Sequence, residues 1–353
     1  MSGIDSPPGN VFITDPVMAS APCRIDSGGT WDIKALALPL ERIRPVTINM
    51  ALTLRTRVVL NPYRSGWLKV SSKGFSHSEE AQEGQVPFDS PFGLFFAALT
   101  YFDLKGVHLH IESDFPVKSA LGGSSTALVA LLKAISQLYV RFGKRPLTPK
   151  HILYLGYQLE DAVNKGKCGI QDQAAAVYGG VNRWVWKYST PTTPFKRESL
   201  LNRDGRRQLS ERILVAYSGL GHNSSRINQK WVNDFRSGKT RAGWEKVNAM
   251  VQDLGDAIRQ KDWSEAARCL RREMALRKEI TPDALIPRTE YLILLAENLG
   301  CGARFAGAGG GGAIWALGEK EKIMKLRKRW VSILASIKGA KVLDCTIDGR
   351  GCE

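Results

Sequence analysis

The sequence predicts a mixed fold of helices and strands, large enough for two lobes or for one large domain with an appendage. The chain has 353 residues, of which 43% are hydrophobic, so it can bury a sizeable core. Helical and strand-like patterns both occur along its length. The turn-rich stretch Pro191–Pro194 is a candidate boundary, and we expect lobes over residues 1–195 and 196–353.

The spacing of apolar residues places the expected elements. Stretches of β-branched or alternating residues predict strands, and helical spacing of apolar residues predicts helices. Thr148 and Pro149 form a cap-and-proline start signal for one helix, and polar composition predicts a loop over Gly74–Gln85. The expected strands are 46–60, 107–112, 213–217, 303–306, 313–316 and 342–347. The expected helices are 92–102, 127–140, 148–164, 244–260, 263–279, 289–299 and 320–337.

The chain is strongly basic, with 50 Lys and Arg against 34 Asp and Glu and a net charge of +16. Such a surface can attract nucleic acid, anionic membranes or phosphorylated small molecules, and a solvated surface without a partner is the alternative. Short basic clusters at Arg268–Lys278 and Lys320–Arg329 have the pattern of outer faces of amphipathic helices.

The cysteines and the hydrophobic pattern exclude several protein classes. The six cysteines form no CxxC pair and have no histidine at zinc spacing, which argues against a disulfide scaffold and a structural zinc site. The sequence has no signal-peptide pattern and no run of about 18 apolar residues. We therefore expect a cytoplasmic protein with reduced thiols and no membrane partner.

A glycine- and serine-rich turn follows the strand expected at 107–112. Leu121, Gly122, Gly123, Ser124 and Ser125 stand where this turn opens a helix. Glycines let the backbone approach an anion, and the start of a helix adds a positive dipole end. Phosphate binding and an ordinary turn with a serine cap both remain open, and no GKS or GKT follows as in a Walker A loop.

Two further segments carry candidate chemistry. Gly307–Gly312 holds four consecutive glycines between strand-like flanks, which suggests a loop held against a ligand, with a flexible linker as the alternative. Asp172 stands among small residues and Glu160 ends the preceding helix. Two carboxylates beside a phosphate loop would suit Mg²⁺ and proton handling, whereas a helix cap and a solvated face are the simpler interpretations.

The fourth segment, Ala21–Asp32, brings Arg24, Asp26 and Asp32 together around a glycine pair. An arginine can neutralise phosphate or favour an ionised hydroxyl, and an aspartate can accept sugar hydroxyls. A surface turn with a local ion pair is the alternative.

Taken in their order along the chain, the four segments resemble motifs of the GHMP kinase family. Pro22–Gly29 is similar to the first family motif, Pro116–Thr126 to its P-x-x-x-G-L-G-S-S ATP loop, and Arg304–Gly312 to its glycine-rich third motif. Gly169–Gly180 resembles a segment of D-glycero-D-manno-heptose 7-phosphate kinases, and L-fucose kinases have a similar one. The resemblance implies a two-lobed α+β fold, with a ribosomal S5 domain 2-like N-terminal, ATP-binding lobe and a ferredoxin-like C-terminal lobe.

The resemblance also implies roles for individual residues. Asp172 and Arg24 would be catalytic, and Ser124 and Glu160 would hold Mg²⁺. The residues that would bind ATP are Leu121, Gly122, Gly123, Ser124 and Ser125. The residues that would bind substrate are Asp26, Asp32, Ser225, Gly309 and Gly310.

The expected activity is ATP-dependent phosphorylation of a hydroxyl on a sugar or sugar phosphate, by a monomer or homodimer. A GHMP kinase acting on a non-sugar such as mevalonate is one alternative. A basic nucleic-acid-binding protein or an inactive relative is another, although no RNA- or DNA-binding motif is present and we expect no nucleic acid partner.

Overall fold

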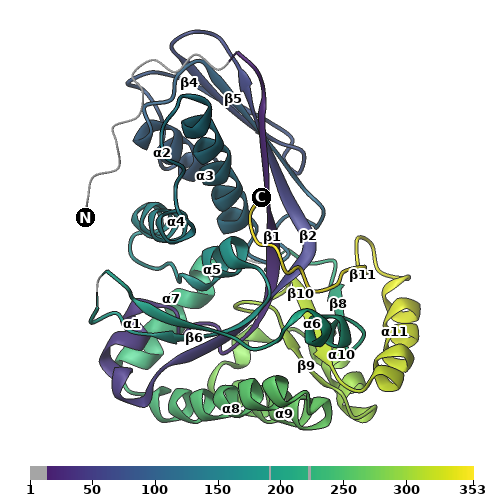
Figure 1. Cartoon of the computed structure of the whole chain (residues 1–353). Helices are drawn as coiled ribbons and strands as arrows, with labels where there is room; N and C mark the ends of the chain where they lie inside the picture. The colour runs from purple at the N-terminus through teal and green to yellow at the C-terminus, as the bar shows by residue number, and fades with distance from the viewer. Residues whose placement is uncertain (1–13, 191, 222–223) are drawn as a thin grey trace.

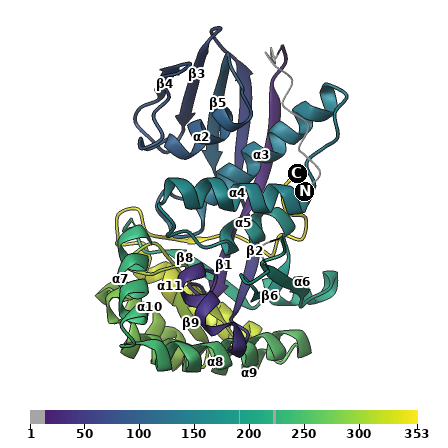
Figure 2. The ribbon, with the colours of Figure 1, turned by 90° about the vertical axis from the view of Figure 1, so that its left-hand side faces the viewer.

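The structure is a computed structural model that describes residues 14–353 apart from 191, 222 and 223; the side chains of residues 224–226 also lie outside the description. The described residues form two sheets with helices packed around them (Figure 1). Figure 2, turned by 90°, shows the long strands β1 and β2 running through most of the height of the molecule.

The first sheet has seven strands in the order β4-β3-β5-β2-β6-β7, with β1 paired to β2. Its 17-residue strand β2 pairs antiparallel with β1, β5 and β6 at different points along its length, and so joins the upper and lower parts of the sheet. The strands are β1 (Val17–Ser27), β2 (Val46–Pro62), β3 (Trp67–Ser72), β4 (Glu79–Gln82), β5 (Val107–Ser113), β6 (Val181–Trp186) and β7 (Phe195–Ser199).

The second sheet is antiparallel and has four strands in the order β11-β8-β10-β9. Its strands are β8 (Ile213–Tyr217), β9 (Gly302–Phe305), β10 (Ala313–Leu317) and β11 (Lys341–Leu343). The strands of the two sheets therefore separate between residues 199 and 213. The expected lobe boundary at 195/196 stays a prediction, and it falls inside β7.

The helices pack apolar stripes against these sheets and against each other. In Figure 1, α2, α3 and α4 lie beside the upper part of the first sheet, and α8 and α9 cross the bottom of the molecule. The helices are α1 (Lys34–Ala37), α2 (Gly93–Tyr101), α3 (Gly123–Arg141), α4 (Pro149–Val163), α5 (Gln171–Tyr178), α6 (Arg203–Ser210), α7 (Ser224–Arg236), α8 (Arg241–Gln260), α9 (Trp263–Ile280), α10 (Pro287–Asn298) and α11 (Lys320–Leu334). Two 3₁₀ turns span Leu38–Ile43 and Pro282–Ala284.

Most of the elements expected from periodicity are confirmed, and the start signal at Thr148 is a true cap whose hydroxyl accepts from the His151 N–H. The loop expected over Gly74–Gln85 is wrong in part, because β4 lies within it and pairs with β3. Strand β1 was not expected. Its polar residues break the alternation that marks a half-buried strand, and nearly all of them are buried.

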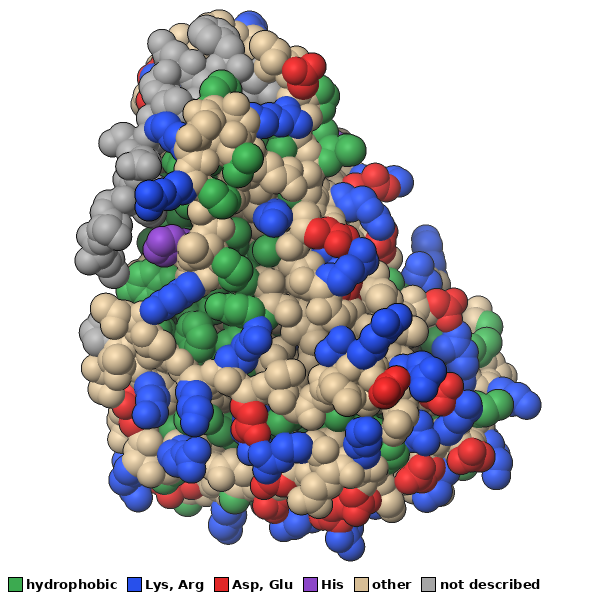
Figure 3. Space-filling model, viewed as in Figure 1, with side chains coloured by type: hydrophobic (Ala, Val, Ile, Leu, Met, Phe, Trp, Pro, Cys, Tyr) green, Lys and Arg blue, Asp and Glu red, His purple; other side chains and the backbone are tan. Residues whose placement is uncertain are grey.

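The surface and the cysteines agree with the composition. On the face in Figure 3, Lys and Arg side chains are spread over much of the surface and interspersed with acidic ones. All six cysteines are free. Among the described helices, none has the length and apolar character needed to cross a bilayer.

Candidate active site

A cavity of about 410 Å³ brings together three of the four segments singled out in the sequence and the near end of the fourth. Arg24, Asp32 and the turn at Gly122–Ser125 line it, as do Glu160 and Asp172. Apolar side chains form part of the wall, and the residues concerned are Phe75, Phe92, Phe95, Ile111 and Phe115. The cavity therefore has an apolar region and a region of charged and glycine-rich lining.

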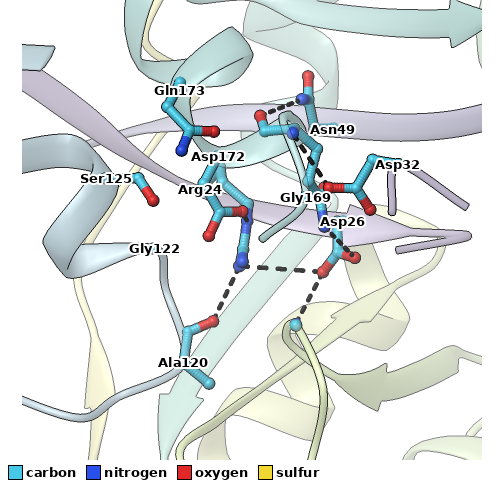
Figure 4. A network of polar contacts seen from close by, with 12 residues as sticks. Arg24, Asp26, Asp32, Asn49, Ala120, Gly122, Ser125, Gly169, Asp172 and Gln173 are labelled. Carbon is cyan, nitrogen blue, oxygen red and sulfur yellow. Dashed lines mark hydrogen bonds and ion pairs between the residues drawn. The ribbon is translucent and has the colours of Figure 1, made fainter. Parts of the chain in front are cut away.

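The glycine turn lies against the carboxylate of Asp172 (Figure 4). Gly122 is the N-cap of α3 and has φ 80°, a conformation that favours glycine. A Cβ added at Gly122 would lie 3.2 Å from Cγ of Asp172. The start of a 19-residue helix, with its positive dipole end, therefore faces the same space as this carboxylate.

Arg24 of β1 and Asp172 of α5 form an ion pair at the cavity wall. The Arg24 Nε–H donates to Asp172 Oδ1 at 2.7 Å, and Nη1 donates to the carbonyl of Ala120 at 2.8 Å. Burial alone would lower the pKa of Arg24, but Asp172 and Asp26 raise it above its usual value. The guanidinium therefore stays charged and holds the carboxylate beside the glycine turn.

Glu160, at the end of α4, is buried and accepts three hydrogen bonds. Ser124 Oγ donates to Oε1 at 2.8 Å, and Ser125 Oγ and Gln173 Nε2 donate to Oε2 at 2.6 Å each. Burial raises the pKa of Glu160 to about 6, although the serine hydrogen bonds oppose the shift.

The residues around Glu160 fit a magnesium ion only in part. In the described part of the chain, no group of three or more His, Cys, Asp or Glu side chains could hold a metal. Magnesium commonly uses one or two carboxylates, with water and phosphate oxygens completing its shell. Glu160 and the hydroxyl of Ser124 are oxygen ligands of the kind that arrangement requires.

Asp32 lines the cavity and receives two backbone hydrogen bonds, and it forms no ion pair with any residue that the structure describes. The N–H groups of Thr30 and Gln171 donate to its two oxygens at 3.0 and 3.1 Å. Burial, together with the nearby charge of Asp172, raises the pKa of Asp32 to about 7. Gly169 lies so close that an added Cβ would overlap the Asp32 carboxylate.

Asp26 is fully buried and does not line the cavity, so its position does not support the predicted contact with substrate. Its oxygens accept from the Gly307 N–H at 2.8 Å and from Gln171 Nε2 at 3.2 Å, and Arg24 Nη1 lies 3.9 Å away. Burial alone would raise the pKa of Asp26, but Arg304 and Arg24 lower it. Asp26 thus ties Arg24 to the glycine run.

The glycine run contributes less to the cavity than its sequence suggested. Gly307 lines the cavity together with Ala308, but Gly309 and Gly310 do not. A Cβ at Gly309 would overlap the carbonyl of Ala284, so this glycine allows close packing of two backbones. The predicted substrate residue Ser225 lies in the first turn of α7, and its side chain lies outside the described residues.

Glu273 and Arg277 of α9 are buried charged residues to which the sequence analysis gave no role. Glu273 of α9 accepts from Arg304 Nη1 at 2.6 Å and from Ser27 Oγ at 2.5 Å, and both charged side chains are 1% exposed. The cluster Arg268–Lys278 was expected to be an outer face, which is wrong for Glu273 and Arg277. A signal existed, because both stand at helical spacing from the apolar residues Leu270 and Met274 of the same stripe.

Comparisons with known proteins identify a shared family. The family model "GHMP kinases N terminal domain" matches residues 93–180, and "GHMP kinases C terminal" matches residues 256–333. A mevalonate kinase of Thermococcus sibiricus is 28% identical over 46% of this chain and 50% of that protein. A D-glycero-alpha-D-manno-heptose 7-phosphate kinase of Campylobacter jejuni is 26% identical over 62% of this chain and 63% of that protein.

A solved structure shows the shared fold. Galactokinase of Lactococcus lactis, complexed with galactose, superimposes with a TM-score of 0.75 at 16% identity and covers 96% of this chain and 95% of that one. The two-lobed α+β fold predicted from the resemblance is thereby confirmed. The chain spans only half to two thirds of the length of the two curated relatives above, so their activities are not carried over with the fold.

Proposed function

Because this chain belongs to the GHMP kinase family, a family of phosphotransferases, we propose that it transfers the γ-phosphoryl group of ATP to a hydroxyl group of a sugar or sugar phosphate. The observation that carries the proposal is the contact between Gly122 and the carboxylate of Asp172 at the wall of one cavity. A helix start that favours phosphate and a carboxylate that can orient a hydroxyl are the two parts this reaction needs in one place.

The shape and charge of the cavity suggest how the donor lies. The apolar wall around Phe92 and Phe95 suits a purine base, and the backbone at Gly122–Ser125 suits the phosphates. Glu160 and Ser124 would hold Mg²⁺, which supplies neutralisation of phosphate charge when bound. Burial raises the pKa of Glu160 only to about 6, so the carboxylate is still mostly ionised at neutral pH, as a magnesium ligand must be.

Asp172 and Arg24 would act on the acceptor. The oxygen of the acceptor hydroxyl forms the new bond to phosphorus, the bond from phosphorus to ADP breaks, and the hydroxyl proton passes to Asp172 or is oriented by it. Arg24 holds Asp172 through its Nε–H and offers positive charge close to the oxygen that loses its proton. Asp26, whose Oδ1 lies 3.9 Å from Arg24 Nη1, helps to keep Arg24 in place.

Asp32 is the residue we propose for recognition of the acceptor. It lines the cavity and forms no ion pair within the described part of the chain, so its oxygens can accept hydrogen bonds from sugar hydroxyls. Mevalonate is a second candidate acceptor, because a mevalonate kinase is among the relatives matched. The carboxylate of mevalonate would meet Asp32 and Asp172 in the same cavity, which favours a neutral polyol at that end.

The test is ADP release by the purified protein with Mg²⁺, ATP and a panel of acceptors. The panel contains free hexoses, heptose and hexose phosphates, and mevalonate. We expect turnover with a sugar or sugar phosphate, and a loss of roughly 10³-fold in kcat for Asp172→Asn, the size typical of removing a group that acts in the transition state. Turnover with mevalonate alone would refute the sugar assignment, and equal turnover by Asp172→Asn would remove this residue from the mechanism.

A further inference from the structure

Arg277 of α9 is a buried cation held among aromatic rings. Its side chain is 1% exposed, and its guanidinium carbon lies 4.5 Å from the ring centroids of both Trp231 and Trp244 and 5.2 Å from that of Phe305. Its Nε–H donates to the Thr281 hydroxyl at 3.0 Å. Its two terminal nitrogens have no hydrogen-bond partner among the described residues.

The nearby carboxylates are already committed to other groups. Glu273, one turn before Arg277, binds Arg304, Ser27 and the Gly28 N–H. Among the described residues, no carboxylate oxygen lies within 4.0 Å of an Arg277 nitrogen. Burial, followed by the like charge of Arg304, lowers the pKa of Arg277 to about 9. A buried charge is normally paired, so this guanidinium lacks a counter-ion that the fold should supply.

Further unpaired donors belong to the aromatic rings that contact this cation and to their neighbours. The indole N–H groups of Trp31, Trp231 and Trp244 are buried and have no partner in the described part of the protein. These rings form one cluster, since the ring centroids of Trp31 and Trp244 are 6.0 Å apart and those of Trp231 and Trp244 are 5.9 Å apart. The Thr240 hydroxyl, one turn before Trp244 at the start of α8, is also buried without a partner.

Donors alone select the chemistry of the ligand. Each unpaired indole and guanidinium group can only donate, so a ligand that pairs with them must accept. A water molecule would accept but would also need acceptors for its own two hydrogens, whereas a small anion accepts from every side. We propose that Arg277, Trp31, Trp231 and Trp244, with Thr240 at the edge, form a buried binding site for a small inorganic anion such as a halide.

The position of the cluster separates this ion from the reactants. Trp31 is fully buried, while its chain neighbours Thr30 and Asp32 line the cavity. On α7, Asn228 lines the cavity and Trp231 follows one turn later. The ion would therefore lie behind the acceptor end of the cavity, enclosed by protein. It would hold the turn after β1 to α7, α8 and α9, whether or not the chain phosphorylates a sugar.

Anomalous diffraction gives the direct test. Crystals of the whole chain grown or soaked in bromide should show an anomalous peak among the rings of Trp31, Trp231 and Trp244, next to Arg277. If other bromide sites in the crystal are well occupied and no peak appears at this place, the proposal is overturned. A peak at this place that is displaced by phosphate would show that the site also accepts oxyanions.

Solution measurements separate a bound ion from a general salt effect. At constant ionic strength, replacing gluconate by chloride should raise the melting temperature of the wild type in proportion to the logarithm of chloride concentration. Arg277→Met keeps the apolar contacts and removes the charge, so its apparent chloride affinity should fall by about tenfold or more. An equal chloride response in wild type and variant would contradict the site.

The control for that comparison is Arg64→Met. Arg64 also stacks on a tryptophan, with its guanidinium carbon 3.7 Å from the Trp67 ring centroid, but it is exposed and distant in the fold. This variant should keep the full chloride response. If Arg277→Met does not fold, Thr240→Val removes a single donor at nearly constant volume and should weaken the response by a smaller factor, and an unchanged response there would count against the proposal.

Discussion

Two glycine-rich segments of this protein look alike in sequence and do different things in the structure. The turn at Gly122–Gly123 opens α3 and borders the cavity, with Gly122 against Asp172. The run Gly307–Gly312 lines the cavity only at its first residue and Ala308. Its later glycines lie against protein backbone, so that a Cβ at Gly312 would come within 2.7 Å of the carbonyl oxygen of Ser119.

The difference shows that a missing side chain can make room for two kinds of neighbour. In the first segment the space beside the glycine is shared with a cavity and a functional carboxylate. In the run it is filled by backbone atoms of Ser119, Ala284 and Gly221, which come from other parts of the chain. Substitution of Gly122 in the turn should therefore change activity first, and substitutions in the run should change stability first.

The largest expected effect is on activity, from Gly122→Ala. Alanine at φ 80° is strained, and its Cβ would lie 3.2 Å from Cγ of Asp172, so the carboxylate must shift. A misplacement of about 1 Å in a reacting group can cost roughly 10²-fold in kcat, so the smaller shift expected here should lower kcat by about tenfold. Steady-state kinetics on folded protein measures it.

The neighbouring glycine provides the control. A Cβ added at Gly123 would make an ordinary contact, 3.5 Å from Cε2 of Phe115, and this residue has no positive φ. Gly123→Ala should keep kcat within a few-fold of the wild type. If both variants lose activity equally, the contact between Gly122 and Asp172 is not what sets the rate.

The next effect is on stability, from Gly309→Ala in the run. The added Cβ would overlap the Ala284 carbonyl, and φ is 75°. Strain and overpacking together should lower the free energy of unfolding by about 2–4 kcal/mol. Urea denaturation measures the loss, and kcat per folded molecule should change little, because Gly309 does not line the cavity.

Gly339→Ala isolates the backbone part of that loss. Gly339 has φ 77° and open space around its Cβ position, so only the conformational cost remains, about 1 kcal/mol. If Gly309→Ala is no worse than Gly339→Ala, the run is not packed against Ala284 as the structure has it.

The third, smaller expected effect is on the pH dependence of stability. It distinguishes Asp26 from Asp32, the two carboxylates of the first motif. The Gly307 N–H of the run donates to Asp26, which stays charged with a lowered pKa. Asp32 forms no ion pair with a described residue, and burial raises its pKa from 3.8 to about 7. A raised carboxyl pKa favours the protonated folded state, so ligand-free stability should fall as pH rises from about 4 to 7.

Asp32→Asn should remove its part of this slope. The expected result is a difference in unfolding free energy between wild type and variant that changes by about 1–3 kcal/mol between pH 5 and pH 8. Glu160 has a pKa of about 6 and gives a slope of the same sign in both proteins, so it cancels in the difference. A difference that does not vary with pH would mean that Asp32 is charged throughout.

The sequence predicted the parts of the site that depend on local geometry. One cavity is lined by Arg24, Gly122, Glu160 and Asp172, as expected, and their roles there stay predictions. The different states of Asp26 and Asp32 could not be predicted, since they depend on partners more than 130 positions away, such as Gly307 and Gln171.

The fold could likewise be predicted where local sequence pattern decides the structure, and not where distant contacts decide it. Long amphipathic helices and alternating strands were found from periodicity, because one face meets water and the other meets the core. Strand β1 was missed because its polar residues, such as Arg24 and Asp26, are buried for their contacts with other segments. Glu273 and Arg277 were assigned to a solvated face for the same reason, since charge is the usual mark of exposure.

The smallest expected effect lies where the two glycine-rich segments meet, at Ala120. Ala120 has φ 63°, and a Cβ added at Gly312 would lie 2.7 Å from the Cβ of Ala120. Ala120→Gly relieves a left-handed conformation but adds freedom to the unfolded chain, so the free energy of unfolding should change by less than about 1 kcal/mol. Activity should be kept, because the backbone carbonyl of Ala120, which accepts from Arg24, is unchanged.

The control is Lys261→Gly, which makes the same exchange at φ 61° after α8, away from the site. Denaturation of both variants compares them: a clearly larger gain at Ala120 would mean that the two segments press on each other, and a loss of several kcal/mol would mean that the Ala120 methyl group holds them together.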